Sequence, residues 1–253
     1  MNANILSSRR DLQRPPSSAA AHTHELPLGG ITPFTTIDFP GRLAAVLYTQ
    51  GCAWRCRYCH NSHLWSFHSD SIIPFRKVLH FLENRKGLLD GVVFCGGEPT
   101  AHESLLAAIQ TVKEMGFQVA LHTTGMYPDR LREVLKSCDW VGMDIKAPFR
   151  SYQKITQTEQ SGTRPLESVD VVLESGVEHE FRTTVHPALL SKEDVLEIAR
   201  ELRNRGAKHF ALQAFQPKGC PDETLKNTVF LTELISDDLK NKLSSMFEAF
   251  QIR

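Results

Sequence analysis

The feature that most constrains the fold of this chain is an alternation that begins near Leu43 and recurs about six times along the sequence. Each repeat consists of a short apolar run, a turn with polar residues, and a stretch with helical periodicity. The expected strands are residues 43–49, 91–94, 117–122, 140–144, 178–185 and 209–213. The expected helices are residues 75–85, 103–115, 128–136, 166–174, 192–204 and 237–250. Most of the strands are continuously apolar, which is typical of parallel strands buried on both faces.

Repeated strand–helix units of this kind predict an α/β fold with a parallel sheet, either open and doubly wound or curled toward a barrel. Six units favour an incomplete (β/α)6 barrel. Ligands in such folds bind where the strands end at their carboxyl edge. The polar segments 51–61 and 96–98 follow the first two expected strands. We therefore expect the functional residues at this edge of the sheet.

Residues 1–25 differ from the rest, because they are rich in Ser, Ala, Arg and Pro and lack hydrophobic periodicity. Such a segment has too little apolar surface to offset the entropy lost on ordering, so we expect a disordered tail. With 253 residues, of which 41% are hydrophobic, the chain is long enough for one large domain or two small ones. We expect a single domain over residues 26–253.

The charge balance narrows the range of partners. Lys plus Arg and Asp plus Glu each number 29, so no global field would recruit nucleic acid or an anionic membrane. No apolar run approaches the roughly 20 residues that span a bilayer, and the first residues lack a signal-peptide pattern. We expect a cytoplasmic protein without a nucleic-acid or membrane partner.

Three of the six cysteines crowd into one short segment. Cys52, Cys56 and Cys59 supply three soft ligands and leave one coordination position without a protein ligand, which fits a [4Fe–4S] cluster with one open iron. A structural zinc site would need a fourth ligand, for which His60 and His63 are the nearest candidates. His60 adjoins Cys59 and is poorly placed to bind the same ion, so we favour the cluster.

The Cys-x3-Cys-x2-Cys motif, with Tyr58 directly before the last cysteine, resembles the signature of the radical S-adenosylmethionine enzymes. The resemblance implies that Cys52, Cys56 and Cys59 are the catalytic and metal-binding residues and that Tyr58 lies at the cofactor site. In that family the open iron binds S-adenosylmethionine. One electron from the reduced cluster then cleaves this cofactor into methionine and a 5′-deoxyadenosyl radical.

A Gly-Gly-Glu turn follows the second expected strand. A turn of this composition is weak evidence by itself, but its position about forty residues after the cysteine segment resembles the GGE motif of the family. The resemblance implies that Gly96, Gly97 and Glu98 bind the amino group of S-adenosylmethionine.

Three charged residues end later strands. Asp144 and Lys146 resemble an Asp-x-Lys pair that contacts S-adenosylmethionine in the activating enzymes of glycyl radical proteins, and Arg182 resembles a strand arginine of that group. The resemblance implies that all three are cofactor-site residues. An ordinary ion pair at a solvated strand end remains the alternative for each.

The segment 122–125 departs from the same group, which has an aspartate that helps to bind a monovalent cation where this chain has His122. We therefore predict no cation there. The remaining cysteines, Cys95, Cys138 and Cys220, are expected to be buried or loop thiols, since none is well spaced for a second cluster.

Segments 36–41 and 52–61 resemble the short activating enzymes, and segments 181–185 and 212–215 resemble the activator of anaerobic ribonucleoside-triphosphate reductase. The resemblance implies an oxidoreductase that abstracts a hydrogen atom from a glycine of a partner protein. A flavodoxin or ferredoxin would supply the electron.

The sequence is compatible with other functions. The chain could activate pyruvate formate-lyase or another glycyl radical enzyme, or act on a small molecule. A metal-binding regulatory module is the non-enzymatic alternative, and it would need neither the Gly-Gly-Glu turn nor Asp144 and Lys146 at the same sheet edge.

Overall fold

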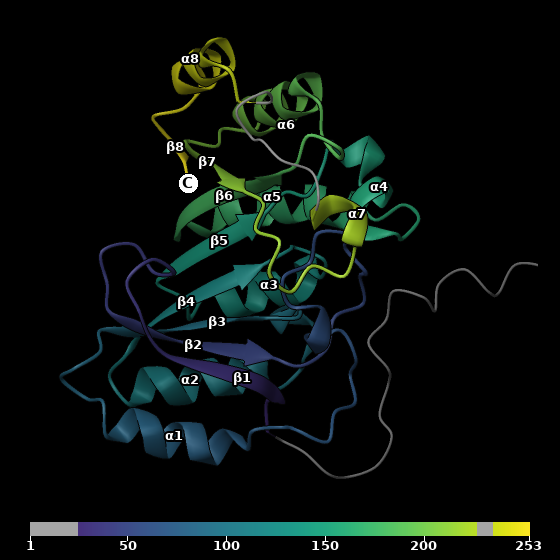
Figure 1. The fold of residues 1–253 in the computed structure, drawn as a ribbon. Coiled ribbons are helices and arrows are strands. Elements are labelled where there is room, and N and C mark those ends of the chain that lie inside the picture. Colours follow the sequence, from purple (N-terminus) through teal and green to yellow (C-terminus); the bar gives the residue numbers. More distant parts are fainter. Residues whose placement is uncertain (1–24, 227–234) are drawn as a thin grey trace, which may run out of the picture.

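The computed structural model describes residues 25–226 and 235–253, which share one sheet of eight strands (Figure 1). The strands are β1 (Leu28–Thr35), β2 (Ala44–Thr49), β3 (Gly91–Gly96), β4 (Gln118–Thr123), β5 (Trp140–Asp144), β6 (Glu178–Val185), β7 (His209–Ala214) and β8 (Ala249–Ile252). They lie side by side in chain order. β1 is antiparallel to β2, and every later pair is parallel. Because β1 and β8 form the two edges, the sheet stays open, as expected for an incomplete barrel.

Helices connect successive parallel strands. The longer ones are α1 (Phe75–Glu83), α2 (Leu105–Glu114), α3 (Pro128–Leu135), α5 (Thr163–Ser175), α6 (Lys192–Asn204) and α8 (Asp237–Met246), and the short ones are α4 (Gln153–Thr156) and α7 (Glu223–Lys226). Local sequence explains their ends. Ser191 and Asp194 form a capping box that begins α6, and Gly176, in the left-handed region with φ 71°, ends α5. None of the helices in the described ranges is both long and apolar enough to cross a membrane.

Apolar side chains fill both faces of the sheet. The main core lies between the sheet and the helices; α6, for example, contributes Val195, Ile198, Ala199 and Leu202 at helical spacing. A smaller core on the opposite face joins Phe39, Ala44, Val46, Val93, Ala120 and Trp140. The ring centroid of Phe39 lies 6.3 Å from that of Trp140, so the segment before β2 covers the inner face at the amino end of the strands. This arrangement leaves the carboxyl ends for polar residues.

The prediction of an α/β sheet of parallel strands is confirmed, and the six expected strands correspond to β2–β7 with ends shifted by at most two residues. The strands β1 and β8 were not expected from the sequence. The expected helix over 237–250 was wrong at its end, because α8 ends at Met246 and residues from Ala249 pair with β7. There Phe250 packs 6.2 Å from Phe210, a contact between distant residues that local periodicity does not reveal. The expected tail lies, except for Glu25, outside the described residues.

Candidate active site

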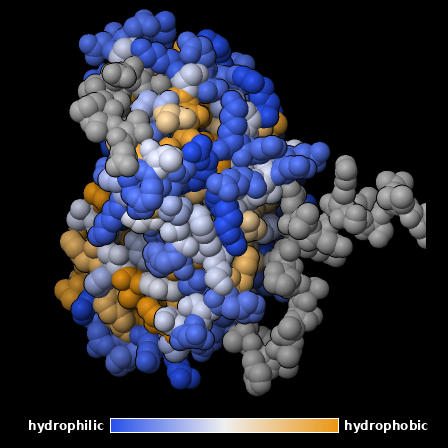
Figure 2. Space-filling model, turned by 45° about the vertical axis from the view of Figure 1, so that its right-hand side comes forward, coloured by the Kyte–Doolittle hydropathy of each residue, from blue (hydrophilic) through white to orange (hydrophobic). Residues whose placement is uncertain are grey.

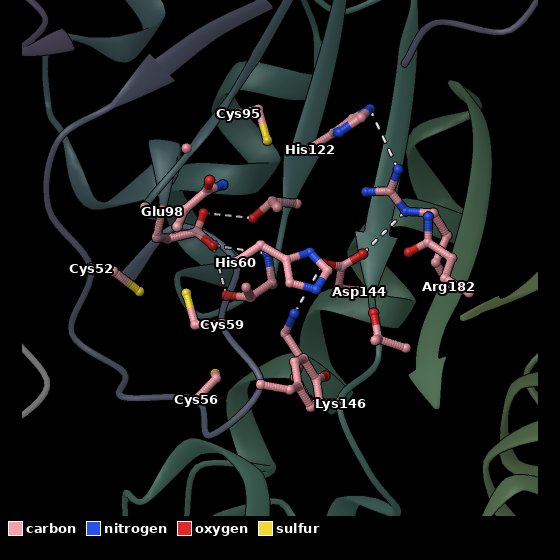
Figure 3. A pocket seen from close by; sticks show the side chains of 18 of the residues that line it. Cys52, Cys56, Cys59, His60, Cys95, Glu98, His122, Asp144, Lys146 and Arg182 are labelled. Atoms are coloured by element: carbon pink, nitrogen blue, oxygen red, sulfur yellow. Dashed lines mark hydrogen bonds and ion pairs between the residues drawn. The ribbon is translucent and has the colours of Figure 1, made fainter. Parts of the chain in front are cut away.

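A cavity of about 590 Å³ lies at the carboxyl edge of the sheet (Figure 3). Its volume is within the usual range for a small-molecule site. Every site residue expected from the sequence lines it: Cys52, Cys56, Tyr58, Cys59, Gly96, Gly97, Glu98, Asp144, Lys146 and Arg182. These residues come from four separate segments, namely the loop after β2, the end of β3, the end of β5 and the strand β6, so the tertiary fold brings together what the sequence separates.

The cysteine loop, residues 51–59, is held by backbone hydrogen bonds on both sides. The N–H of Gly51 donates to the carbonyl of Leu64 at 2.8 Å, and the N–H of Cys52 donates to that of Trp65 at 3.1 Å. Within the loop, the N–H of Cys59 donates to the carbonyl of Cys56 at 3.0 Å. These bonds fix the course of a segment that has no regular secondary structure of its own.

The three thiols of this loop gather at one end of the cavity (Figure 3). Cys52 and Cys56 are buried and Cys59 is half-buried. Burial raises the pKa of all three thiols, that of Cys56 to about 12. In the described part of the chain, no three His, Cys, Asp or Glu side chains are arranged to hold a single metal ion. An iron–sulfur cluster binds each cysteine through a different iron and therefore fits three thiolate donors that do not converge on one point.

The Gly-Gly-Glu turn lies directly against the start of the cysteine loop. The N–H of Gly97 donates to the carbonyl of Thr49, and the N–H of Glu98 donates to that of Gly51, both at 2.9 Å. Gly96 has φ 116°, and a Cβ on Gly97 would fall on the carbonyl oxygen of Gly51. Only glycine allows this close approach of two backbones, which is the physical reason for the motif.

The carboxylate of Glu98 is fully buried and accepts five hydrogen bonds. Oε1 accepts from the N–H and hydroxyl of Thr100 at 3.1 and 2.5 Å and from the hydroxyl of Thr123 at 2.7 Å. Oε2 accepts from the N–H and hydroxyl of Thr124 at 2.8 and 2.6 Å. The side chain thus ties the end of β4 to the end of β3, and the backbone of the turn is left to face a ligand.

Asp144 lies between two buried cations. Its Oδ2 is 3.0 Å from Nζ of Lys146 and its Oδ1 is 3.1 Å from Nε of Arg182. Burial alone would raise the pKa of Asp144, but the charges of Lys146 and Arg182 outweigh it and hold the pKa well below its usual range. Burial opposes the charged form of Lys146 as well, yet its pKa is raised because Asp144 is so close. The cluster carries one net positive charge, which suits an anionic group of a ligand.

Tyr58 lies beside this charged cluster, with Nζ of Lys146 5.4 Å from the centre of its ring. The ring is 4% exposed, and its hydroxyl is a buried polar atom without a hydrogen-bond partner in the described structure. Such unsatisfied groups are rare in folded proteins, and their presence at a cavity wall is consistent with a ligand site.

His122, at the end of β4, binds the segment before β2. Its Nε2 lies 2.8 Å from the backbone carbonyl of Asp38, which can only accept, so Nε2 carries the proton and donates. The longer 3.5 Å approach of Nη1 of Arg182 to the same atom is then a contact between two donors. Burial and the nearby charge of Arg182 lower the pKa of His122 to about 3, so the imidazole is neutral. Its ring meets that of Trp140 edge-on at 5.6 Å. His122 thereby joins β4 to the segment that covers the inner face of the sheet.

The cavity is also lined by residues that were not expected there from the sequence, among them Asp38, Trp54, Trp65, Thr123, Thr124 and Gln213. Thr123 and Thr124 lie at the end of a strand, and this position could have identified them as site residues from the sequence. No sequence pattern identifies Trp54 or Trp65 as site residues. Cys95 lines the cavity too, and Cys138 is buried away from it. Cys220 is buried against the cysteine loop, where its thiol donates to the carbonyl of Arg57 at 3.3 Å.

Two solved structures with the same architecture support the description of the fold. SuiB from Streptococcus suis, bound to S-adenosylmethionine, matches with a TM-score of 0.65 at 14% identity, over 82% of this chain and 49% of its own. QueE from Escherichia coli matches with a TM-score of 0.52 at 20% identity, over 78% of this chain and 87% of its own. This chain therefore spans about half the length of SuiB, and the likeness concerns the fold alone.

Sequence similarity is more specific. The family model of the Radical SAM superfamily matches residues 46–202. A glycyl-radical enzyme activating enzyme of Methanocaldococcus jannaschii, MJ1227, is 30% identical over 208 residues, which are 79% of this chain and 84% of that protein. The pyruvate formate-lyase-activating enzyme of Clostridium pasteurianum is 32% identical over 176 residues, 66% of this chain and 72% of that enzyme. The chain is therefore a radical S-adenosylmethionine enzyme, and it belongs to the family that activates glycyl radical enzymes.

Proposed function

We propose that this enzyme places the glycyl radical on an anaerobic ribonucleoside-triphosphate reductase. The segments that resemble the activator of that reductase, 181–185 and 212–215, lie on β6 and β7. Arg182 and Thr184 of the first and Gln213 and Ala214 of the second line the cavity. That these segments form one wall of the candidate active site is the observation that carries the proposal.

The residues of the cavity have distinct roles in this proposal. Members of the superfamily use a [4Fe–4S] cluster and S-adenosylmethionine, which together supply a radical able to abstract a hydrogen atom. Cys52, Cys56 and Cys59 are the thiolate ligands of the cluster. The backbone of the Gly-Gly-Glu turn accepts the amino group of the cofactor, and Lys146 and Arg182 attract its carboxylate.

Two proteins are tested side by side as acceptors of the radical. The enzyme is reconstituted anaerobically with iron and sulfide, reduced, and mixed with S-adenosylmethionine and either the reductase or pyruvate formate-lyase. Electron paramagnetic resonance is expected to show a glycyl signal with the reductase. A signal with pyruvate formate-lyase alone would assign the alternative partner, which the similarity to the enzyme of Clostridium pasteurianum favours. Release of 5′-deoxyadenosine and methionine without either signal would instead indicate another substrate.

The role of Glu98 is tested by replacement with Ala. The change leaves the buried donors of Thr100, Thr123 and Thr124 without their acceptor, so the turn loses its rigid attachment to β4. We expect the affinity for S-adenosylmethionine to fall about ten-fold or more, with the iron content of the protein unchanged. Equilibrium dialysis and an iron assay measure the two quantities.

Glu103→Ala is the control. The side chain of Glu103 is 89% exposed, and its one ion pair is a long contact of 3.9 Å between Oε1 and Nη2 of Arg130, which contributes little to stability. Its affinity for the cofactor should equal that of the unchanged enzyme. Loss of iron from the Glu98 variant would show that Glu98 supports the cysteine loop rather than the cofactor site.

A further inference from the structure

The cysteine loop has two sides with different surroundings. Its thiols face the cavity, whereas Ala53 and Arg55 are exposed on the outer turn. The N–H groups of Arg55 and Arg57 donate to the carbonyls of Thr156 and Ile155 at 3.1 and 3.0 Å. The short helix α4 therefore lies directly beside the outer turn.

Three exposed cations surround this turn, and we call the surface that they form the outer basic face: Arg55, Lys154 and Arg164. Lys154 belongs to α4. Arg164, in the first turn of α5, lines the same small hollow as Ala53. This side of the molecule is turned forward in Figure 2, where hydrophilic residues cover most of the surface.

The charges of the outer basic face are not neutralised within the described ranges, where no carboxylate forms an ion pair with Arg55, Lys154 or Arg164. Other exposed cations do have such partners, for example Arg150 with Glu197 at 2.6 Å. Two exposed carboxylates are near in the chain, that of Glu159 in the adjoining 157–162 turn and that of Glu167 three residues after Arg164 on α5, so the three cations exceed them by one charge. Since the whole chain has a net charge of zero, this local excess of positive charge is a specific feature of the face.

Arg55 connects the face to the cluster site. Its Nη1 donates to the carbonyls of Cys52 and Trp54 at 2.7 and 2.9 Å, and its guanidinium lies 5.3 Å from the ring centre of Trp65, which lines the cavity. The outer basic face is therefore joined to the loop that carries the thiols by hydrogen bonds as well as by the chain itself. Electron transfer favours such short covalent and hydrogen-bonded routes.

We propose that the outer basic face docks an acidic one-electron carrier protein. The carrier gives one electron to the oxidised cluster, [4Fe–4S]²⁺ to [4Fe–4S]⁺, and is itself oxidised by one electron. Electron-transfer encounters use small interfaces, and complementary charge steers them more than buried area does. Because the face lies on the opposite side of the loop from the cavity, the carrier can dock while the cavity is occupied. The inference concerns reduction of the cluster and is independent of which glycyl radical enzyme is the partner.

Charge reversal tests the proposal in the reconstituted enzyme. The double variant Lys154→Glu, Arg164→Glu is compared with Arg76→Glu, Lys77→Glu, which makes the same charge change on exposed residues of α1. Titration calorimetry measures the affinity for a purified bacterial flavodoxin at low and high salt. Stopped-flow absorbance measures the rate at which reduced flavodoxin, or a small uncharged reductant such as photoreduced deazariboflavin, reduces the cluster.

We expect the Lys154/Arg164 variant to bind flavodoxin about ten-fold or more weakly at low salt, with the difference shrinking at high salt. Reduction by flavodoxin should slow in proportion, while reduction by deazariboflavin should be unchanged. The α1 control should match the unchanged enzyme in every measurement. Equal flavodoxin affinity in both double variants would overturn the proposal. So would an equal loss with the small reductant, because that result would place the defect in the cluster site and not in docking.

Discussion

Cys56→Ala is expected to abolish cleavage of S-adenosylmethionine. Cys56 is 7% exposed and lines the cavity with Cys52 and Cys59, so its loss leaves the cluster one of its three protein ligands short. The reconstituted variant should retain almost no cluster-bound iron and release no detectable 5′-deoxyadenosine. Iron analysis and chromatography of the products measure the two effects.

Cys138→Ala is the matched control, because Cys138 is equally buried and lies away from the cavity. Its thiol donates to the carbonyl of Val134 in the last turn of α3 at 3.3 Å. Iron content and product release should be close to those of the unchanged enzyme. An equal loss in both variants would contradict the assignment of the cluster to the cysteine loop.

Asp144→Asn is expected to lower the free energy of unfolding by about 3 kcal/mol, because it leaves Lys146 and Arg182 buried without their shared counter-charge. The side chains of Lys146 and Arg182 are only 9% and 7% exposed, so water compensates little. The affinity for S-adenosylmethionine should fall as well, since the two cations are no longer held in place. Urea denaturation and equilibrium dialysis measure these effects.

The comparison for this prediction is Asp238→Asn, which removes a carboxylate from an exposed pair with Lys242 on α8. That pair joins side chains that are 57% and 74% exposed, and its loss should cost less than about 1 kcal/mol. Adding Lys146→Met to Asp144→Asn should recover part of the lost stability, because one unpaired cation is then removed. Similar stabilities for the Asp144 and Asp238 single variants would refute the structural role of Asp144.

The lowered pKa of Asp144 predicts how the stability of the protein changes with pH. A carboxyl group whose pKa is lowered on folding stabilises the protein above its ordinary pKa of about 3.9, and this contribution is lost as the pH falls further. The stability difference between the unchanged enzyme and Asp144→Asn should therefore be constant near neutral pH and decrease only in acid.

The amino-acid sequence by itself determined the sheet of parallel strands and the composition of the candidate site. Short, continuously apolar runs such as 140–144 are typical of buried strands, and a Gly-Gly-Glu turn or a cysteine triad has its functional groups within a few residues of one another. Local periodicity and local motifs are therefore readable without a structure.

Only the tertiary structure decided what joins these local features. It placed Ala249–Ile252 beside β7 instead of in a helix, and it showed that Thr123 and Thr124 satisfy the carboxylate of Glu98. It also set α4 against the outer turn of the cysteine loop, where Lys154 and Arg55 leave positive charge exposed. The physical reason is the same in each case. Hydrogen bonds, packing and charge act between residues that are close in space, and residues that are close in space can be far apart in the sequence.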